Sequence, residues 1–526
     1  MTTNNIYKNV LTKGAQILLI MFAPLLVVSC IEDDSVYGED TMSIEISDVE
    51  TMYNVMSFSG ETLNINPTVT SSFPESDMEY EWSYFDYSKS TGTVNSDTLQ
   101  ATVICNDKNL SYESRLPDGD YGFFFKARSK STGYTKAVLT RVYAASALSK
   151  GFYVLKETEE GNSDVDLYNA DEKLLLENVF STYMGKTIKG KPLHMDIVGN
   201  QSYLDSLEAV PAASNLMCIT TQEGDVKWVR IRDCKIVKSF EDCHYEPIEG
   251  EIPYRTVRIN QLAYYVTSNG VYTANINSGT GTFGEAVYNS YGSTHLTSTR
   301  FNQLIYWNPQ TRSLGMIDGN GYSCSFLNRL TDYQQMIKYR PTYQQMDCLF
   351  MGDNMVNWND QIIIVMQGLA DPSQRVIYFV TTNMSQASLM AVRELDPSTN
   401  IAQAEKYAIN YQQATLLYGL HGNKIYSLDL NNNSSVEEEL HFEGLPANEQ
   451  ITYIANKYIK AGVNQFDYFV VGTQSGSTYK LYFYGMVGGK PDGNPVFTIS
   501  GSGKMVNVEY TDPQLTRLVG SGILDD

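Results

Sequence analysis

Short strand-like segments with one shared layout recur along the chain after residue 150. Each segment has an apolar and an aromatic residue at its centre, and several follow a turn that contains Gly or Asn. Short runs of this kind, separated by turns, predict β-strands. A helical pattern occurs only in residues 171–185, which we expect to be an insertion between strands. The clearest strand cores are residues 271–275, 304–308, 376–380, 424–429 and 480–484.

These cores resemble the inner strands of β-propeller blades, where an apolar–aromatic pair packs between neighbouring sheets and Asp or Asn ends the strand. At about 45 to 55 residues per blade, residues 150–526 have room for about seven or eight blades. A large sandwich and an open solenoid are the alternative arrangements for this region.

Residues 43–147 have a different pattern, in which half-buried strands follow one another at short spacing and predict a β-sandwich of about 100 residues. Trp82 is expected in its core, with ligand stacking as the alternative. Tyr121 follows a turn and suits a tyrosine corner, while the lone Cys105 leaves the core without a bridging disulfide. This segment resembles a PKD-type immunoglobulin-like module. The alternating residues include Tyr80, Trp82 and Tyr84, and then Phe123, Phe125 and Ala127.

The start of the chain predicts export and lipid attachment. Lys8 and Lys13 precede an apolar run, residues 15–28, that is too short to span a bilayer and instead indicates a signal peptide. Residues 27–30, Val-Val-Ser-Cys, resemble a bacterial lipobox, in which the cysteine becomes the lipidated first residue. A buried structural cysteine is the alternative for Cys30.

An acidic cluster, Glu32, Asp33 and Asp34, follows Cys30 directly. It resembles the signal that sends lipoproteins of Bacteroidota to the outer face of the outer membrane. The resemblance implies an outer-membrane protein, lipid-anchored through Cys30, on the extracellular face.

The chain carries 38 basic and 60 acidic side chains, a net charge of −22. This charge disfavours nucleic acid and anionic lipid headgroups as partners, and leaves cationic peptides, neutral glycans and proteins open. The six cysteines after Cys30 permit disulfides without establishing any. Cys234 and Cys243 are close enough in sequence to close a small hairpin loop, whereas a zinc site with His244 lacks a fourth ligand. The remaining candidates for pairing are Cys218, Cys324 and Cys348.

No catalytic motif is present in the sequence, and we expect neither enzymatic activity nor a cofactor. The alternative is a catalytic pair of carboxylates from distant blades of a propeller, which a sequence alone does not reveal. Residues expected to contact a ligand or partner are aromatic. Tyr333 and Tyr343 open two copies of Tyr-Gln-Gln-Met, and Trp307 and Trp358 lie near strand or loop ends. The alternative is that such rings fill the blade cores.

A lipobox, a PKD-like sandwich and a propeller that opens at residues 150–157 together resemble the PKD-like family of Bacteroidota surface lipoproteins. Phe152 stands where that family often has tryptophan. Proteins of this family commonly accompany a SusC/SusD-type pair, a TonB-dependent channel with a lipoprotein lid. The resemblance implies an accessory binding or docking subunit of a nutrient-uptake system, with a peptide or glycan as ligand. A freestanding glycan-binding protein, or a propeller-based glycan-cleaving enzyme, is the alternative.

The expected fold is therefore all-β, with an immunoglobulin-like sandwich followed by a β-propeller. The expected domains are a signal peptide at residues 1–29, an acidic tether at 30–42, the PKD-like sandwich at 43–147 and the propeller at 150–526.

Overall fold

The computed structural model describes most of the chain after residue 41. The described residues are 42–57, 60–86, 101–117, 119–170, 172–205, 210–276, 279–299, 301–327, 339, 345–356, 360–383, 386–459 and 465–512. Nine of the residues singled out above lie outside these ranges, namely Lys8, Lys13, Cys30, Glu32, Asp33, Asp34, Tyr333, Tyr343 and Trp358.

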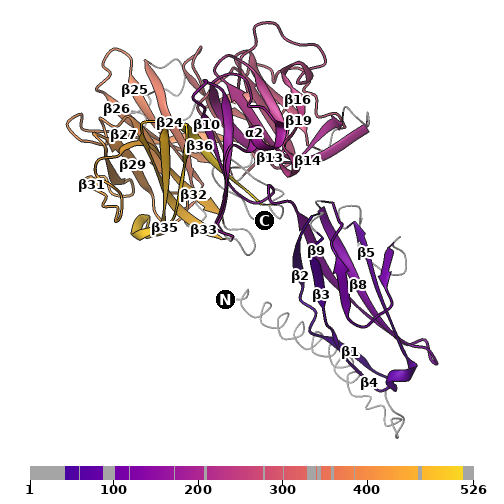
Figure 1. Cartoon of the computed structure of the whole chain (residues 1–526). Helices are drawn as coiled ribbons and strands as arrows, with labels where there is room; N and C mark the ends of the chain where they lie inside the picture. Colours follow the sequence, from indigo (N-terminus) through magenta and orange to yellow (C-terminus); the bar gives the residue numbers. More distant parts are fainter. Residues whose placement is uncertain are drawn as a thin grey trace, which may run out of the picture. The chain divides into compact units, whose positions relative to one another are not determined.

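The fold is all-β, as predicted, and the strands form two compact units (Figure 1). One unit contains residues 1–53, 62–112 and 121–141, and the other contains 54–61, 113–120 and 142–526. Among the described residues, none of the helices is long and apolar enough to cross a membrane.

The first strands, β1 to β9, form the sandwich. A five-stranded sheet has the order β2-β9-β8-β5-β6, and β1–β4 and β3–β7 form two antiparallel pairs. The bounds are β1 (Ile44–Ser47), β2 (Met52–Met56), β3 (Thr62–Ile65), β4 (Thr68–Ser71), the 3-10 helix η1 (Glu75–Asp77), β5 (Met78–Asp86), β6 (Thr102–Cys105), β7 (Leu110–Glu113), β8 (Gly119–Ser129) and β9 (Thr135–Ala145).

Trp82 is the centre of the sandwich core, which confirms the prediction that it is a core residue. Its ring is completely buried and packs 4.8 Å from the ring of Phe125. Its indole N–H donates a hydrogen bond to the carbonyl of Lys108 at 3.1 Å, so the polar atom of this large buried ring is satisfied.

Seven antiparallel sheets follow one another in the described residues between 151 and 511, within the predicted seven or eight blades. The first four contain β36 (Lys504–Thr511), β10 (Gly151–Glu157), β11 (Ser163–Asn169) and β12 (Leu174–Leu176); β13 (Pro192–Asp205), β14 (Val210–Thr221), β15 (Val226–Arg230) and β16 (Lys235–Ser239); β17 (Pro253–Ile259), β18 (Leu262–Thr267) and β19 (Gly270–Asn275); and β20 (Leu296–Ser298), β21 (Leu304–Asn308), β22 (Ser313–Ile317) and β23 (Cys324–Phe326).

The last three sheets have four strands each. They contain β24 (Met346–Asn354), β25 (Gln361–Gly368), β26 (Arg375–Thr382) and β27 (Ala387–Glu394); β28 (Lys406–Ile409), β29 (Leu416–His421), β30 (Lys424–Asp429) and β31 (Glu438–Glu439); and β32 (Gln450–Ile459), β33 (Phe466–Ser475), β34 (Thr478–Val487) and β35 (Lys490–Ser502). The short helices are α2 (Val179–Met184), η3 (Ile231–Asp233) and η4 (Phe240–Asp242).

The first and last strands of the propeller's chain segment pair with each other within the first sheet. β36 pairs antiparallel with β10, from Gly151 opposite Thr511 to Glu157 opposite Lys504. Phe152 packs at this junction against rings of the first and seventh sheets, with centroids 4.8 Å from both Phe483 and Tyr510. A C-terminal strand that completes the first sheet is typical of a β-propeller and is absent from an open solenoid.

The predicted strand cores are strands, but they are not the innermost ones. Residues 304–308 form β21, the second strand of its sheet, and the other four cores lie in the third strands β19, β26, β30 and β34. A strand in the middle of a sheet that is covered on both faces buries consecutive side chains, as all five residues of β21 show. Neighbouring sheets contact each other through their first strands, or through β36 in the first sheet, so these strands are the innermost ones.

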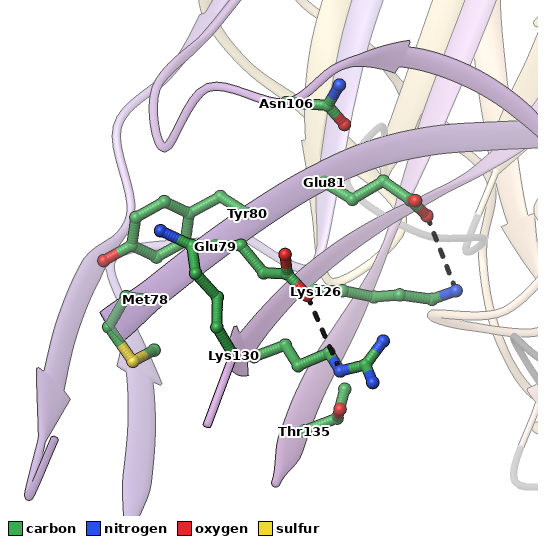
Figure 2. A pocket seen from close by; sticks show the side chains of 9 residues that line it. Met78, Glu79, Tyr80, Glu81, Asn106, Lys126, Lys130 and Thr135 are labelled. Atoms are coloured by element: carbon green, nitrogen blue, oxygen red, sulfur yellow. Dashed lines mark ion pairs between the residues drawn. The ribbon is translucent and has the colours of Figure 1, made fainter. Parts of the chain in front are cut away.

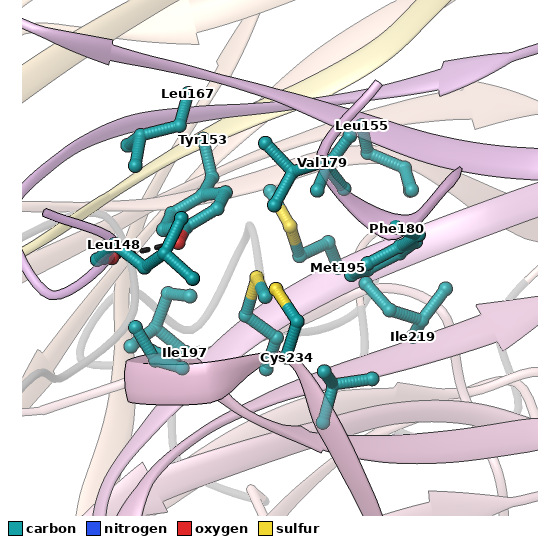
Figure 3. Packing of buried hydrophobic residues seen from close by; sticks show 14 of the residues in the cluster. Leu148, Tyr153, Leu155, Leu167, Val179, Phe180, Met195, Ile197, Ile219 and Cys234 are labelled. Atoms are coloured by element: carbon teal, nitrogen blue, oxygen red, sulfur yellow. Dashed lines mark hydrogen bonds between the residues drawn. The ribbon is translucent and has the colours of Figure 1, made fainter. Parts of the chain in front are cut away.

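The segment predicted to be helical is mostly not helical. Residues 174–176 form β12, and the helix α2 comprises only Val179–Met184. Val179 and Phe180 are buried in a cluster with Tyr153 and Met195, so the helix begins where two apolar residues enter the core (Figure 3).

The possible Cys234–Cys243 disulfide is not present. Cys234 belongs to the cluster of Figure 3, together with Tyr153, whereas Cys243 packs in a different cluster with Trp228 and Tyr265. All six cysteines from Cys105 to Cys348 are free in the structure.

Candidate functional site

The innermost strands of the propeller carry charged and polar side chains that contact one another across sheets. We call one group of them the axial cluster. It comprises His194 and Asp196 of β13, Arg255 of β17, Lys457 of β32, and Asn507 and Glu509 of β36. These strands belong to four different sheets, and residues more than 300 positions apart in the sequence meet in the cluster.

Asp196 is the acceptor at one side of the axial cluster. Arg255 donates to both of its carboxylate oxygens, from Nη2 to Oδ1 at 2.6 Å and from Nε to Oδ2 at 3.4 Å. The backbone N–H of Thr256 donates to Oδ2 at 3.1 Å, and Nε2 of His194 lies 3.3 Å from Oδ1. Two sheets are thus joined by a fork-like arginine–carboxylate pair, the strongest geometry for such a pair.

Glu509 is the acceptor at the other side. Lys457 Nζ lies 3.0 Å from its Oε1, and Asn507 Nδ2 donates to the same oxygen at 3.3 Å. Asn507 also exchanges hydrogen bonds with the backbone of Met195, which connects β36 to β13. The first, second and seventh sheets are therefore linked through polar side chains of their innermost strands.

The two halves of the cluster interact with each other. Arg255 is electrostatically coupled to Glu509 and to Lys457, although β17 and β32 belong to the third and seventh sheets. Arg255 is also coupled to His295, directly before β20 of the fourth sheet. The charges of the two pairs therefore influence one another, although their strands belong to different sheets.

The pKa values follow from this arrangement. Burial alone would raise the pKa of Asp196, but Arg255 and His194 outweigh burial and hold the pKa well below its ordinary value. Burial would lower the pKa of Lys457, but Glu509 keeps it above its usual range. Asp196 and Lys457 therefore keep their charges at neutral pH.

Asp353, on another innermost strand, has a raised pKa, whereas the pKa of Asp196 is lowered. Burial, together with the nearby negative charge of Asp360, raises the pKa of Asp353 in β24 to about 7. Thr297 of β20 donates to Asp353, and Tyr411 is electrostatically coupled to it. A carboxyl group with this pKa exchanges its proton near neutral pH, unlike the permanently charged Asp196.

The axial cluster presents two cations and two anions in fixed positions, and its side chains keep contact with solvent. Arg255 and Asp196 are 20% and 10% exposed, and Lys457 and Glu509 are 9% and 18% exposed. Such an arrangement suits a ligand that carries both charges, such as an amino acid or a peptide end, better than a neutral sugar. Within the described residues, no group of three or more His, Cys, Asp or Glu side chains could hold a metal ion.

The sandwich carries a polar pocket of about 630 Å³ (Figure 2). Two ion pairs cross its floor between β5 and β8: Glu81 with Lys126 at 3.5 Å and Glu79 with Arg128 at 3.6 Å. These pairs are directly opposite in the strand register. The other lining residues are Met78, Tyr80, Asn106, Lys130 and Thr135.

Of the residues predicted to contact a ligand or partner, Trp307 lies within the described part of the chain. It is not at the surface. It is 1% exposed, packs in the core between the fourth and fifth sheets, and donates its indole N–H to Asp347 at 2.9 Å. The prediction that its ring contacts a ligand is therefore wrong, because the ring is covered on both faces. The most exposed tyrosines in the described residues are instead Tyr245, Tyr288 and Tyr322, each at least 80% exposed.

Fold and site together define an all-β protein with a PKD-type sandwich and a β-propeller whose innermost strands carry a charged cluster. A model of the PKD-like family matches residues 30–192. The resemblance to that family is thereby confirmed for the N-terminal part of the chain.

None of the curated proteins compared with the chain matches it. Similar solved structures include a quinonprotein alcohol dehydrogenase-like protein from Bacteroides thetaiotaomicron VPI-5482, with 12% identity over 89% of this chain and 99% of that one and a TM-score of 0.38. A hypothetical selenium-binding protein from Sulfolobus tokodaii has 11% identity over 69% and 93% of the two chains, with a TM-score of 0.43. Likenesses of this degree describe neither a ligand nor an activity of the present chain.

Proposed function

We propose that this protein is a lipid-anchored binding subunit on the outer face of the outer membrane, where it accompanies a SusC/SusD-type uptake system. In this role the propeller binds peptide-like nutrient through the axial cluster, and the sandwich holds the propeller away from the membrane. The observation that carries the binding role is the axial cluster itself, in which opposite charges from four sheets remain in contact with solvent.

The membrane location is supported by the start of the chain. Cys30 follows a signal-like segment, and the match to the PKD-like family begins at this same residue. The lipid chains carried by a lipobox cysteine exceed the two signals needed for stable membrane attachment. The acidic residues Glu32, Asp33 and Asp34 support export to the outer face.

The first test is purification of the native, lipidated protein from detergent-solubilised outer membranes, with mass spectrometry of the proteins that come with it. Recovery of a TonB-dependent channel and its lid in near-equal amounts would support the uptake complex. Recovery of this chain alone would contradict it and favour a freestanding receptor.

The anchor is tested by Cys30→Ala. We expect the variant to lose its lipid and to leave the membrane fraction, because no other attachment is proposed. Ser29→Ala, which keeps a small residue before the cysteine, is the matched control and should stay in the membrane. A Cys30→Ala variant that remains in the membrane would contradict the proposed anchor.

The ligand class is tested by calorimetric titration of the soluble chain with dipeptides, free amino acids and neutral oligosaccharides. Binding of the zwitterionic compounds that is lost in Arg255→Met would support the axial cluster as the site. Binding of neutral glycans alone would contradict it.

A further inference from the structure

Among the described residues, one stretch of the sandwich's five-stranded sheet has no neighbouring strand on one side. β6 pairs with Trp82, Ser83 and Tyr84 of β5, and in the described part of the chain no strand pairs with residues 78–81 on that side. After Cys105 the chain bends away, and the bend is held by the hydrogen bond from the Trp82 indole to Lys108. The pocket of Figure 2 opens where the pairing stops, with Asn106 on its far side.

The strand register shows which backbone groups face this opening. Lys130 N–H donates to Asp77 O, which makes Asp77 and Lys130 a hydrogen-bonded pair of the β5–β8 ladder. In an antiparallel ladder the bonding direction alternates, so the odd-numbered residues of β5 bond to β8 and the even-numbered ones point to the other side. Met78 N–H is already bonded to Glu75 O. The N–H and C=O of Tyr80 and the C=O of Met78 are therefore directed toward the opening.

The side chains beside the opening set the chemistry of a partner. Glu79 and Glu81 lie on one face of β5, next to the position that an added strand would take. On the opposite side, toward β8, they form ion pairs with Arg128 and Lys126. Residues directly opposite on adjacent strands favour opposite charges and disfavour like charges. The net charge of −22 attracts cations from a distance as well.

The other face of β5 is apolar and largely buried, with Met78 and Trp82 5% and 0% exposed. Tyr80 stacks on Phe125 with ring centroids 5.9 Å apart, and its hydroxyl donates to Glu75 at 2.9 Å. Met78 lies on the same face two residues earlier. A partner strand would therefore alternate between basic side chains over Glu79 and Glu81 and apolar side chains beside Tyr80.

We propose that this edge of β5 binds an extended, basic segment of a partner protein by strand addition, with alternating basic and apolar residues. Backbone hydrogen bonds to Tyr80 and Met78 provide the pairing, and the two glutamates select the charge. The peptide site is independent of the axial cluster and of the proposed transporter, and it gives the sandwich a docking role in addition to its role as a spacer.

The probes for the test are short synthetic peptides added to the soluble chain without residues 1–30. One alternates lysine and valine, the second alternates glutamate and valine, and the third is the lysine peptide with alternate amides methylated. We expect salt-sensitive binding of the lysine peptide, at least tenfold weaker binding of the other two, and slowed amide exchange of Tyr80. Equal binding of the methylated peptide, or of the glutamate peptide, would overturn the proposal, because neither result is compatible with charge-selective strand addition.

Variants make the test specific. Glu79→Gln with Glu81→Gln should weaken binding of the lysine peptide about fivefold to tenfold, while Glu45→Gln on β1, an exposed acidic residue outside the pocket, should leave it unchanged. Exchanging both ion pairs, by Glu79→Arg, Arg128→Glu, Glu81→Lys and Lys126→Glu together, should reverse the preference toward the glutamate peptide. An unchanged preference in this variant, with circular dichroism showing a folded sandwich, would overturn the assigned role of the glutamates.

Discussion

Arginine–carboxylate pairs occur in both parts of the molecule, but their surroundings differ. In the propeller, Arg255 and Asp196 join two sheets, are at most 20% exposed, and approach to 2.6 Å. In the sandwich, Arg128 and Glu79 lie on one sheet, are about half exposed, and are 3.6 Å apart. The comparison teaches that the same chemistry serves two purposes: a buried pair fixes the position of its groups, whereas an exposed pair exchanges partners at little cost.

The largest expected effect comes from breaking the buried pair. Arg255→Met should destabilise the propeller by roughly 3 kcal/mol, because Asp196 would remain as a largely buried charge without its main partner. Hydrogen–deuterium exchange in β13 and β17 measures this loss separately from the sandwich. Unchanged exchange in these strands would show that Asp196 does not depend on Arg255.

A smaller, pH-dependent effect is expected at Asp353. Its folded-state pKa of about 7 lies above its ordinary value of 3.8, so its contribution to stability is complete below pH 4 and is lost as the pH rises through 7. Asp353→Asn should therefore stabilise the propeller by about 2 kcal/mol at pH 8 and leave it unchanged near pH 4. Urea unfolding at the two pH values checks this, and an equal effect at both would contradict the raised pKa.

The smallest effect is expected in the sandwich. Arg128→Met should change the stability of the sandwich by less than about 0.5 kcal/mol, because Glu79 remains solvated when its partner is removed. Hydrogen–deuterium exchange in β5 and β8 measures this change in stability. A loss as large as that of Arg255→Met would remove the distinction between the two kinds of pair.

Local patterns were sufficient for much of the fold. Alternating aromatic residues identified the sandwich and placed Trp82 in its core, and repeated strand cores indicated a row of similar sheets. The same cores were assigned to the wrong strands, because an apolar–aromatic pair marks burial on both faces and not proximity to the axis. Trp307 was misjudged for a related reason: the sequence shows that a ring ends a strand, but not that the next sheet covers it.

The axial cluster was not predicted, because its members are brought together only by the order of the sheets. Asp196 and Arg255 are 59 residues apart, and Met195 and Asn507 are 312 apart. A weak signal was present in retrospect, since Lys457 interrupts an otherwise largely uncharged strand and His194 and Asp196 alternate along another. Charges at such positions indicate contacts with other charges, but the partners are unknown until the sheets are arranged.

The pairing of β10 with β36 has a consequence for the order in which the molecule folds. All strands of the sandwich lie between residues 44 and 145, so it can fold while the rest of the chain is still being made. The first sheet of the propeller requires Gly151 to meet Thr511, and until then one edge of β10 has no partner. Contacts of such sequence separation form slowly, and an unpaired edge invites aggregation. Synthesis that stops before residue 504 would therefore yield a folded sandwich attached to a propeller that cannot close, a product suited to degradation and not to use.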